Sequence, residues 1–166
     1  KDITALTEDE RETILKEFND TEYTYDIEAN TTLYSLFNKQ AEKNEDKVCI
    51  IANEKEITYK EFKSYVERLD NEVRKITNSE KSVIAVICER SFEMYGAVYG
   101  IIRGGNAYLP IDPNYPQDRI DYILENSKAK AVITQDKFAH LVTSVPTINA
   151  TEILNSDYVV EKTPIL

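Results

Sequence analysis

The segment from Gly104 to Pro116 constrains the fold of this chain more than any other part of its sequence. Gly104 and Gly105 end a helical pattern, and the short apolar run 107–111 follows them. Two prolines, an aspartate and an asparagine then break the chain before a new helical pattern begins. Turn chemistry on both sides therefore predicts a buried strand held between two helices.

The residues from 82 onward repeat this alternation of strand and helix. Helical patterns run from a Ser91 cap through Arg103, from Pro116 onward with Ile120, Ile123 and Leu124 on one face, and over 137–141. Apolar runs predict strands at 83–88, 107–111, 129–134 and 147–148. Such units build an α/β fold, a parallel sheet with right-handed crossovers and helices on both faces.

The first residues predict one isolated helix followed by a loop. Thr7 and Glu10 have capping-box spacing, so a helix is expected from there to about Asn19. Its narrow apolar stripe consists of Ile14, Leu15 and Phe18. Residues 20–31 are polar and aromatic without a period, which is typical of a connecting loop.

Between these parts the sequence predicts two further helices and a hairpin. Thr32 caps a helix with Leu33, Leu36, Phe37 and Ala41 on one face. Residues 48–52 and 56–58 predict two strands joined by a turn at 53–55. A second capping box at Thr58 opens the most regular helix, with Phe62, Tyr65, Val66, Leu69, Val73 and Ile76 on one face. Residues 150–166 show no clear pattern.

Composition excludes several classes of protein. The 166 residues are long enough for one domain, and 42% are hydrophobic and 30% charged. The net charge of −10 argues against a nucleic-acid partner. No apolar run approaches the roughly 20 residues that span a membrane. Since the chain begins at Lys1 without a signal peptide or initiator methionine, we expect a processed or excised piece.

The two cysteines, Cys49 and Cys88, lie in apolar runs of strand character. We expect two small buried hydrophobes rather than a disulfide, as suits the reducing cytoplasm.

Each residue that could take part in catalysis or ligand binding also has a simpler structural explanation. Gly104–Gly105 is too short for a phosphate-binding fingerprint and suits a helix C-cap with tight packing. Asp112 and Asp118 suit turn capping and first-turn helix charge better than a pair of general acid and base. For Arg90 and Arg119 we expect ion pairs with carboxylates rather than a bound anion.

The remaining candidates also lack the neighbours that catalysis or metal binding requires. Ser91 has no nucleophile-elbow context and suits a helix N-cap. His140 is the only histidine, and no cysteine lies near it in the sequence to complete a metal site. Tyr23, Tyr25 and Tyr34 gather around the loop before the second helix, either as a docking surface or as half-buried core residues.

Several segments resemble the adenylation domains of nonribosomal peptide synthetases, members of the adenylate-forming, AMP-binding enzyme superfamily. Residues 102–113 follow the second core motif of these domains almost position by position, and 114–120 continue it. Residues 57–62 resemble the first core motif, and 89–94 are also typical. The opening 6–11, with 18–21, resembles the segment that follows a condensation domain.

The resemblance implies an activity for the protein to which such a chain belongs. These domains use ATP and Mg²⁺ to convert an amino acid into its aminoacyl-adenylate, and they load it on the phosphopantetheine thiol of a carrier protein. The implied partners are the remainder of the adenylation domain, an upstream condensation domain and a downstream carrier domain.

The phosphate loop, the ribose-binding aspartate and the catalytic lysine of the family are not found in residues 1–166. We therefore assign no catalytic, cofactor-binding or metal-binding residue, and expect the chain alone to be inactive. Residues 1–22 are expected to be a linker-like segment with one helix, and 23–166 an incomplete N-terminal subdomain of the adenylate-forming fold. Apolar surface left uncovered by this incompleteness predicts self-association.

Two alternatives stay open. One is that the chain is a stand-alone binding or scaffold module derived from such a domain. The other is that it is part of a ligase that activates an acyl, aryl or D-alanine substrate. The condensation-linker-like start argues against the latter.

Overall fold

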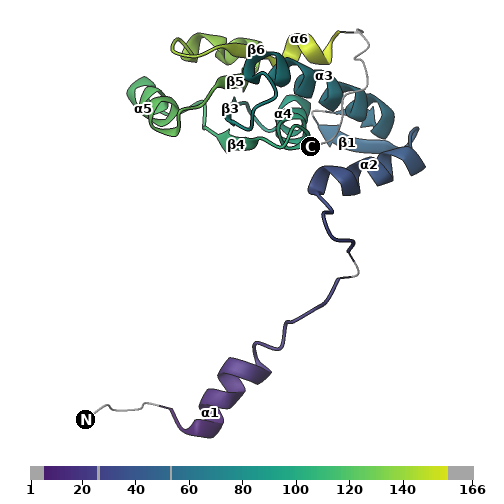
Figure 1. Ribbon diagram of the computed structural model, residues 1–166, viewed down its shortest axis with the longest axis vertical. Coiled ribbons are helices and arrows are strands. Elements are labelled where there is room, and N and C mark those ends of the chain that lie inside the picture. Colours follow the sequence, from purple (N-terminus) through teal and green to yellow (C-terminus); the bar gives the residue numbers. More distant parts are fainter. Residues whose placement is uncertain (1–5, 26, 53, 157–166) are drawn as a thin grey trace. The chain divides into compact units, whose positions relative to one another are not determined.

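A computed structural model describes residues 6–25, 27–52 and 54–156 of the chain (Figure 1). The chain divides into two compact units, Lys1–Thr31 and Thr32–Leu166, which we describe separately.

The first unit contains one helical segment in two forms. Helix α1 covers Glu8–Glu12 and continues as the π-helix η1 over Thr13–Glu17, where one α-helix was predicted. The capping box is confirmed: Thr7 Oγ1 accepts a hydrogen bond from the Glu10 amide at 3.3 Å, and the Glu10 carboxylate accepts one from the Thr7 amide at 2.8 Å. The stripe residues Ile14, Leu15 and Phe18 are all exposed within this unit.

The second unit contains two sheets and most of the helices. Its elements are α2 Leu33–Lys43, β1 Val48–Ala52, β2 Lys55–Thr58, α3 Tyr59–Thr77, β3 Val83–Ile87, α4 Phe92–Arg103, β4 Ala107–Pro110, α5 Gln117–Ser127, β5 Ala131–Thr134, the 3-10 helix η2 Asp136–Leu141, β6 Thr147–Asn149 and α6 Ala150–Leu154.

The predicted parallel sheet is present. Its four strands have the order β4-β3-β5-β6, and every neighbouring pair is parallel. The expected hairpin is a separate antiparallel pair of β1 and β2. The fold class predicted from the sequence is confirmed.

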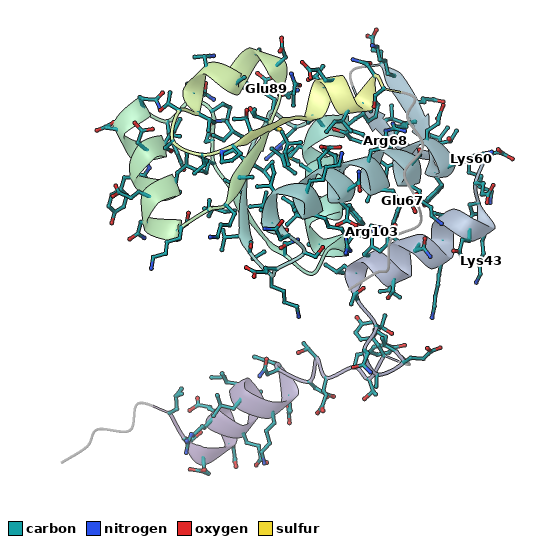
Figure 2. All side chains as sticks on the ribbon, turned by 45° about the horizontal axis from the view of Figure 1, so that its top comes forward. Lys43, Lys60, Glu67, Arg68, Glu89 and Arg103 are labelled. Carbon is teal, nitrogen blue, oxygen red and sulfur yellow. The ribbon has the colours of Figure 1, made fainter. Side chains whose placement is uncertain are left out.

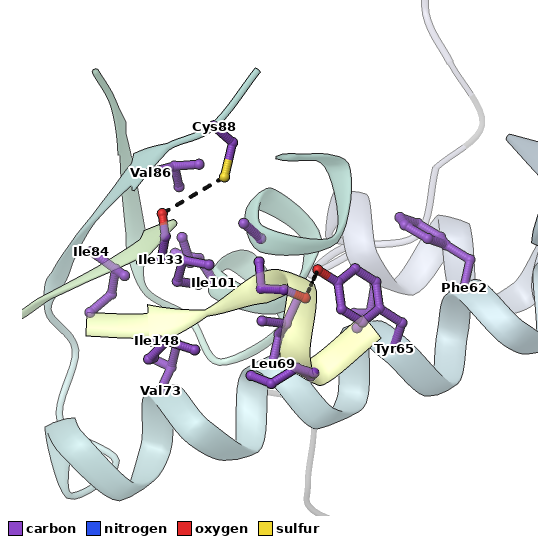
Figure 3. Close-up of a cluster of buried hydrophobic side chains, with 14 of the residues drawn as sticks. Phe62, Tyr65, Leu69, Val73, Ile84, Val86, Cys88, Ile101, Ile133 and Ile148 are labelled. Atoms are coloured by element: carbon purple, nitrogen blue, oxygen red, sulfur yellow. Dashed lines mark hydrogen bonds between the residues drawn. The ribbon is translucent and has the colours of Figure 1, made fainter. Parts of the chain in front are cut away.

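Side chains of β3 alternate between two cores, one on each face of the sheet. Ile84 and Val86 belong to the core shared with α2, α3, α4 and α6 (Figure 3). Ala85 and Ile87 belong to the core shared with α5, which lies on the other side of the sheet (Figure 1). Both faces of the central strand are therefore covered by helices.

Helix α3 supplies the largest apolar face of the first core. Phe62, Tyr65, Val66, Leu69 and Val73 are at most 1% exposed, as their helical spacing predicted. Thr58 caps the helix by accepting a hydrogen bond from the Glu61 amide at 3.2 Å. Burying a side chain of the size of Leu69 stabilises the fold by about 1.5–3 kcal/mol, so this face accounts for much of the stability.

Three glycines allow α4 to approach α3 closely, a contact that was not predicted from the sequence. Gly96, Gly100 and Gly104 recur at every fourth position of one helix face. A Cβ at Gly100 would lie 2.9 Å from the Leu69 Cβ, and one at Gly96 would overlap the Tyr65 ring. These contacts require the absence of side chains on this face of α4.

The prediction that 107–111 forms a buried strand is wrong in one respect. Residues Ala107–Pro110 do form β4, but β4 is an edge of the described sheet, and Ala107, Tyr108 and Pro110 are exposed. An edge position suits Pro110, which lacks an N–H group for a central ladder.

The predicted face of α2 is also partly wrong. Phe37 and Ala41 are buried, whereas Leu33 and Leu36 are 72% and 42% exposed. Tyr34 takes the buried place, at 1% exposure, because its hydroxyl finds a partner inside the protein.

At the other end, α6 was not predicted from the sequence; Asn149 caps it by accepting hydrogen bonds from the Thr151 and Glu152 amides. Residues 157–166 of the patternless tail lie outside the described residues.

Candidate site at the carboxyl ends of the sheet

A groove of about 780 Å³ opens at the carboxyl ends of β3 and β4. The carboxyl edge of a parallel sheet is where α/β proteins bind ligands, so this groove is the first candidate site. Its lining comprises Val86, Cys88, Glu89, Arg90, Met94, Tyr95, Val98, Tyr99, Tyr108, Pro110, Ile111, Asp112, Pro113, Asn114 and Tyr115.

Buried polar side chains fix the loop between β3 and α4. The Gln135 side chain accepts a hydrogen bond from the Glu89 amide at 3.0 Å and donates one to Ser91 Oγ at 3.4 Å. Ser91 Oγ in turn accepts from the Met94 amide at 3.5 Å, which confirms Ser91 as the cap of α4. The hydroxyl of Ser91 is thus engaged in structure and is not presented as a nucleophile.

The Cys88 thiol at the end of β3 is also unsuited to nucleophilic attack. It is buried and donates a hydrogen bond to the Ile133 carbonyl at 3.9 Å (Figure 3). Burial raises the pKa of Cys88 to about 12, so the thiol stays protonated at neutral pH. Both cysteines are free, but only Cys88 is buried as predicted, and Cys49 is half-buried.

The proline turn after β4 is closed by its own side chains. Asp112 accepts hydrogen bonds from the amide and the side chain of Asn114, both at 2.9 Å, which confirms its turn-capping role. Asp118 lies separately, in the first turn of α5, where its charge suits the helix dipole. The structure therefore does not bring these carboxylates together as an acid–base pair.

Of Arg90, Arg119 and His140, only Arg90 lines the groove, and the prediction of ion pairs for the two arginines is wrong among the described residues. Arg119 stacks on the Tyr115 ring, 4.7 Å from its centroid, and makes no ion pair with any described residue. Arg90 lines the groove and is exposed, and it makes no ion pair within the described residues either. His140 is exposed in η2. Among the described residues, no group of three histidine, cysteine or acidic side chains is placed to hold a metal ion.

A buried charged cluster, which sequence reasoning missed, joins α2, α3 and α4. Asp70 pairs with Arg103 and with Arg74, whose Nε donates to both carboxylate oxygens at 2.9 and 3.0 Å. Arg103 Nε also donates to the Tyr34 hydroxyl at 3.2 Å, and Arg103 lies where the C-terminal end of α4 meets α2 (Figure 2). The Asp70 side chain is fully buried and that of Arg103 is 5% exposed.

Arg103 keeps its charge through contact with its neighbours. Burial alone lowers the pKa of Arg103, but the neighbouring Asp70 carboxylate and Tyr34 hydroxyl raise it above its ordinary value. The same contacts explain Gly104, since a Cβ there would lie 2.6 Å from Asp70 Oδ1. Gly105 follows at φ 70°, a left-handed conformation that favours glycine, and it completes the predicted C-cap.

All four glycines of the chain are therefore used within α4 and its C-cap. The groove has tyrosines, aliphatic side chains and two prolines as its main surface, with Glu89, Arg90 and Asp112 among them. This arrangement suits packing against apolar groups.

Comparison with known proteins shows which proteins this chain resembles. A family model described as "AMP-binding enzyme" matches residues 37–165. Bacitracin synthase 3 of Bacillus licheniformis is 38% identical over 136 residues, which are 82% of this chain and 2% of the relative. Tyrocidine synthase 3 of Brevibacillus parabrevis is 37% identical over 141 residues, 85% of this chain and 2% of the relative.

Solved structures of nonribosomal peptide synthetases also resemble this chain. The nonribosomal peptide synthetase FmoA3, in a form bound to AMPPNP, superposes with a TM-score of 0.77 at 29% identity, over 89% of this chain and 16% of the other. A four-domain nonribosomal peptide synthetase, AB3403, has a TM-score of 0.68 at 24% identity, over 80% of this chain and 10% of the other, and shows the fold alone.

The resemblance to peptide-synthetase adenylation domains is thereby confirmed for most of the chain, although the chain spans only a small share of each relative. Because the family model matches well over half of its residues, the chain belongs to the AMP-binding enzyme family.

Proposed function

We propose that these 166 residues are the N-terminal part of an amino-acid-activating adenylation domain of a nonribosomal peptide synthetase. The observation that carries the proposal is the identity of 36–38% with antibiotic synthases over more than four fifths of the chain. The matched region includes the segment Gly104–Pro116, which here forms β4 and the turn that closes the groove.

The reaction of the whole domain is the joining of an amino acid to AMP. A carboxylate oxygen of the amino acid attacks the α-phosphorus of ATP, a new P–O bond forms, and the bond to pyrophosphate breaks. The thiol of a carrier-bound phosphopantetheine then displaces AMP and forms a thioester. Both steps need cations and backbone amides around the phosphate, because negative charge concentrates there.

The side chains described here do not fit ATP and Mg²⁺ by themselves. The four glycines are already used in α4 and its cap, and the groove offers one arginine beside two carboxylates. We therefore assign no catalytic or nucleotide-binding residue to this chain. Its role in the domain is that of a scaffold, which holds β3, β4 and the loops after these strands in position.

The first unit suits a connection to a preceding domain. Residues 1–22 contain a capped helix whose apolar side chains Ile14, Leu15 and Phe18 are exposed in their own unit. We propose that this segment links the adenylation domain to an upstream condensation domain, and that residues from 23 onward belong to the adenylation core. A carrier domain would receive the activated amino acid.

We place the enzyme in the cytoplasm, which the two free cysteines support. Among the described residues, none of the helices combines the length and apolarity needed to cross a bilayer.

The test is ATP–pyrophosphate exchange with two proteins. One is the 166-residue chain, and the other continues through the whole adenylation domain. We expect exchange with one preferred amino acid from the longer protein only. Exchange above background by the 166-residue chain would contradict its assignment as a scaffold, and a longer protein that is inactive with every amino acid would contradict the proposed reaction.

A further inference from the structure

A second groove, which we call the α3 groove, has a volume of about 630 Å³ and shares no lining residue with the groove at the carboxyl ends of β3 and β4. It follows one face of α3, since Lys60, Glu67 and Arg68 recur in its lining at helical spacing (Figure 2). Strand β2, the start of α4 and the residues that end α6 complete the lining. The α3 groove is thus bounded by four separate elements of the second unit.

Part of the lining is apolar. Ile57 is 8% exposed, Phe92 and Leu154 are partly buried, and all three belong to the core shared with α2, α3, α4 and α6. An apolar segment laid in the α3 groove would extend this core outward. Apolar surface that stays open in this way favours an occupant with apolar side chains.

Charged side chains of both signs stand around this apolar surface. Lys55 and Lys60 are exposed, and neither makes an ion pair with a described residue. Of the three glutamates in the lining, Glu61 is held by the Thr58 cap, whereas Glu56 and Glu67 make no ion pair among the described residues. The α3 groove therefore favours an occupant that brings both carboxylates and an ammonium group.

Helix α6 ends in a fixed position at the wall of the α3 groove. The Tyr65 hydroxyl donates a hydrogen bond to the Ala150 carbonyl at 3.0 Å inside the core, which anchors α6 to α3 (Figure 3). At the other end of α6, the Ser156 hydroxyl donates to the Ile153 carbonyl at 2.7 Å. Ser156 also lines the groove, so the chain leaves α6 directly beside it.

The next residues of the chain have the chemistry that the α3 groove favours. Residues 157–162 lie outside the described residues, and their sequence is Asp-Tyr-Val-Val-Glu-Lys. Three apolar side chains are thus flanked by a carboxylate on one side and by a carboxylate and an ammonium group on the other. Because it is tethered at Ser156, this segment meets the groove at high effective concentration.

We propose that residues 157–162 fill the α3 groove as a strap across β2, α3 and α6. The side chains of Tyr158, Val159 and Val160 cover the apolar lining. The carboxylates of Asp157 and Glu161 approach the two lysines. The strap fixes the direction in which the chain continues after α6.

Hydroxyl-radical footprinting of the 166-residue chain, with mass spectrometry of single tyrosines, tests the proposal. We expect Tyr158 to react several-fold more slowly than Tyr122, which is 66% exposed on α5. In the double variant Lys55→Glu/Lys60→Glu, repulsion replaces attraction, and the reaction of Tyr158 should rise toward that of Tyr122. The control Lys81→Glu reverses an exposed lysine outside the α3 groove and should leave Tyr158 protected.

A second variant changes the strap itself. Val159→Asp places a charge in the apolar triplet and should also release Tyr158, while the buried Tyr65 stays unreactive and shows that the core is intact. Reaction of Tyr158 at the rate of Tyr122 in the unsubstituted chain would overturn the proposal. Protection that survives both variants would place Tyr158 on another surface, and protection that disappears on dilution would assign the groove to a second copy of the chain; either result would contradict the strap.

Discussion

At the scale of single residues, the buried charges are what the sequence conceals most. Asp70 and Arg103 lie 33 positions apart, and nothing local in either helical pattern indicates that they meet. Tyr34 was grouped with Tyr23 and Tyr25, yet it is buried against Arg103, while the other two are 72% and 70% exposed in the first unit. Partners of this kind are set by how helices pack and not by spacing.

Replacing Asp70 with asparagine tests the weight of the cluster. The change removes the buried carboxylate charge that Arg74 and Arg103 both contact. Loss of one partner from a buried pair costs about 3–5 kcal/mol, so we expect a fall of that size in the free energy of unfolding measured with urea. Lys75→Ala is the control: that lysine is 60% exposed, and the loss should stay below about 1 kcal/mol.

Gly100→Ala tests the close packing of α4 on α3. Alanine is the better helix former by about 1 kcal/mol, so a helix free in solvent would be stabilised. Here the new Cβ would lie 2.9 Å from Leu69 Cβ and 3.2 Å from the Asp70 amide nitrogen. We expect a net loss of about 1–3 kcal/mol from overpacking, seen as a lower urea midpoint. A stabilised variant would show that the helices have room to separate.

Glu61 gives the fold a small dependence on pH. Hydrogen bonds from the Thr58 amide and hydroxyl lower the pKa of Glu61 below its ordinary value. A lowered pKa means that the carboxylate stabilises the folded state above the ordinary range of about 4.3 and loses this effect as the pH falls through the lower folded value.

The wild type should therefore exceed Glu61→Gln in stability at neutral pH by less than about 1 kcal/mol, since the pair is exposed. The difference should shrink as the pH falls below the ordinary carboxyl value of about 4.3 and through the lower pKa of the folded state. Urea unfolding at several pH values measures it, and a difference that stays constant would contradict this role.

At the scale of elements, signals between residues close in the sequence predicted the helix caps well. The sequence did not show which elements lie side by side. The caps at Thr7, Thr32 and Thr58 depend on residues three positions apart, and all three are confirmed. The position of β4 at the edge depends on strand order, which the sequence of β4 does not carry. The lining of the groove was missed for the same reason, since its residues come from β3, α4, β4 and the loops that follow the two strands.

Pro110→Val tests whether the missing N–H of Pro110 keeps the outer edge of β4 from pairing with another strand. Valine has a backbone N–H, so residue 110 would then point an amide away from β3, as residue 108 does. An edge strand with several such unpaired amides pairs readily with other strands. We expect the 166-residue chain to form larger species at rising concentration, seen by light scattering. Pro116→Val, which changes the N-cap of α5 outside the sheet, should leave the particle size unchanged.

At the scale of the whole molecule, the chain combines a well-packed sheet with an uncovered groove and an exposed helical segment. The core is fully formed around β3 and β5, whose buried residues are at most 3% exposed. The groove, by contrast, presents apolar side chains to solvent, and the apolar stripe of the first unit is exposed within that unit. This division is expected of a part that folds its own core and leaves its contacts with neighbouring parts open.

Direct titration of ATP with Mg²⁺ into the 166-residue chain, followed by calorimetry, tests its assignment as a scaffold most directly. With every glycine used in α4 and its cap, we expect no saturable binding at millimolar nucleotide, while the longer protein binds ATP. Saturable binding of one ATP per 166-residue chain would contradict the assignment and would place a nucleotide site within these residues.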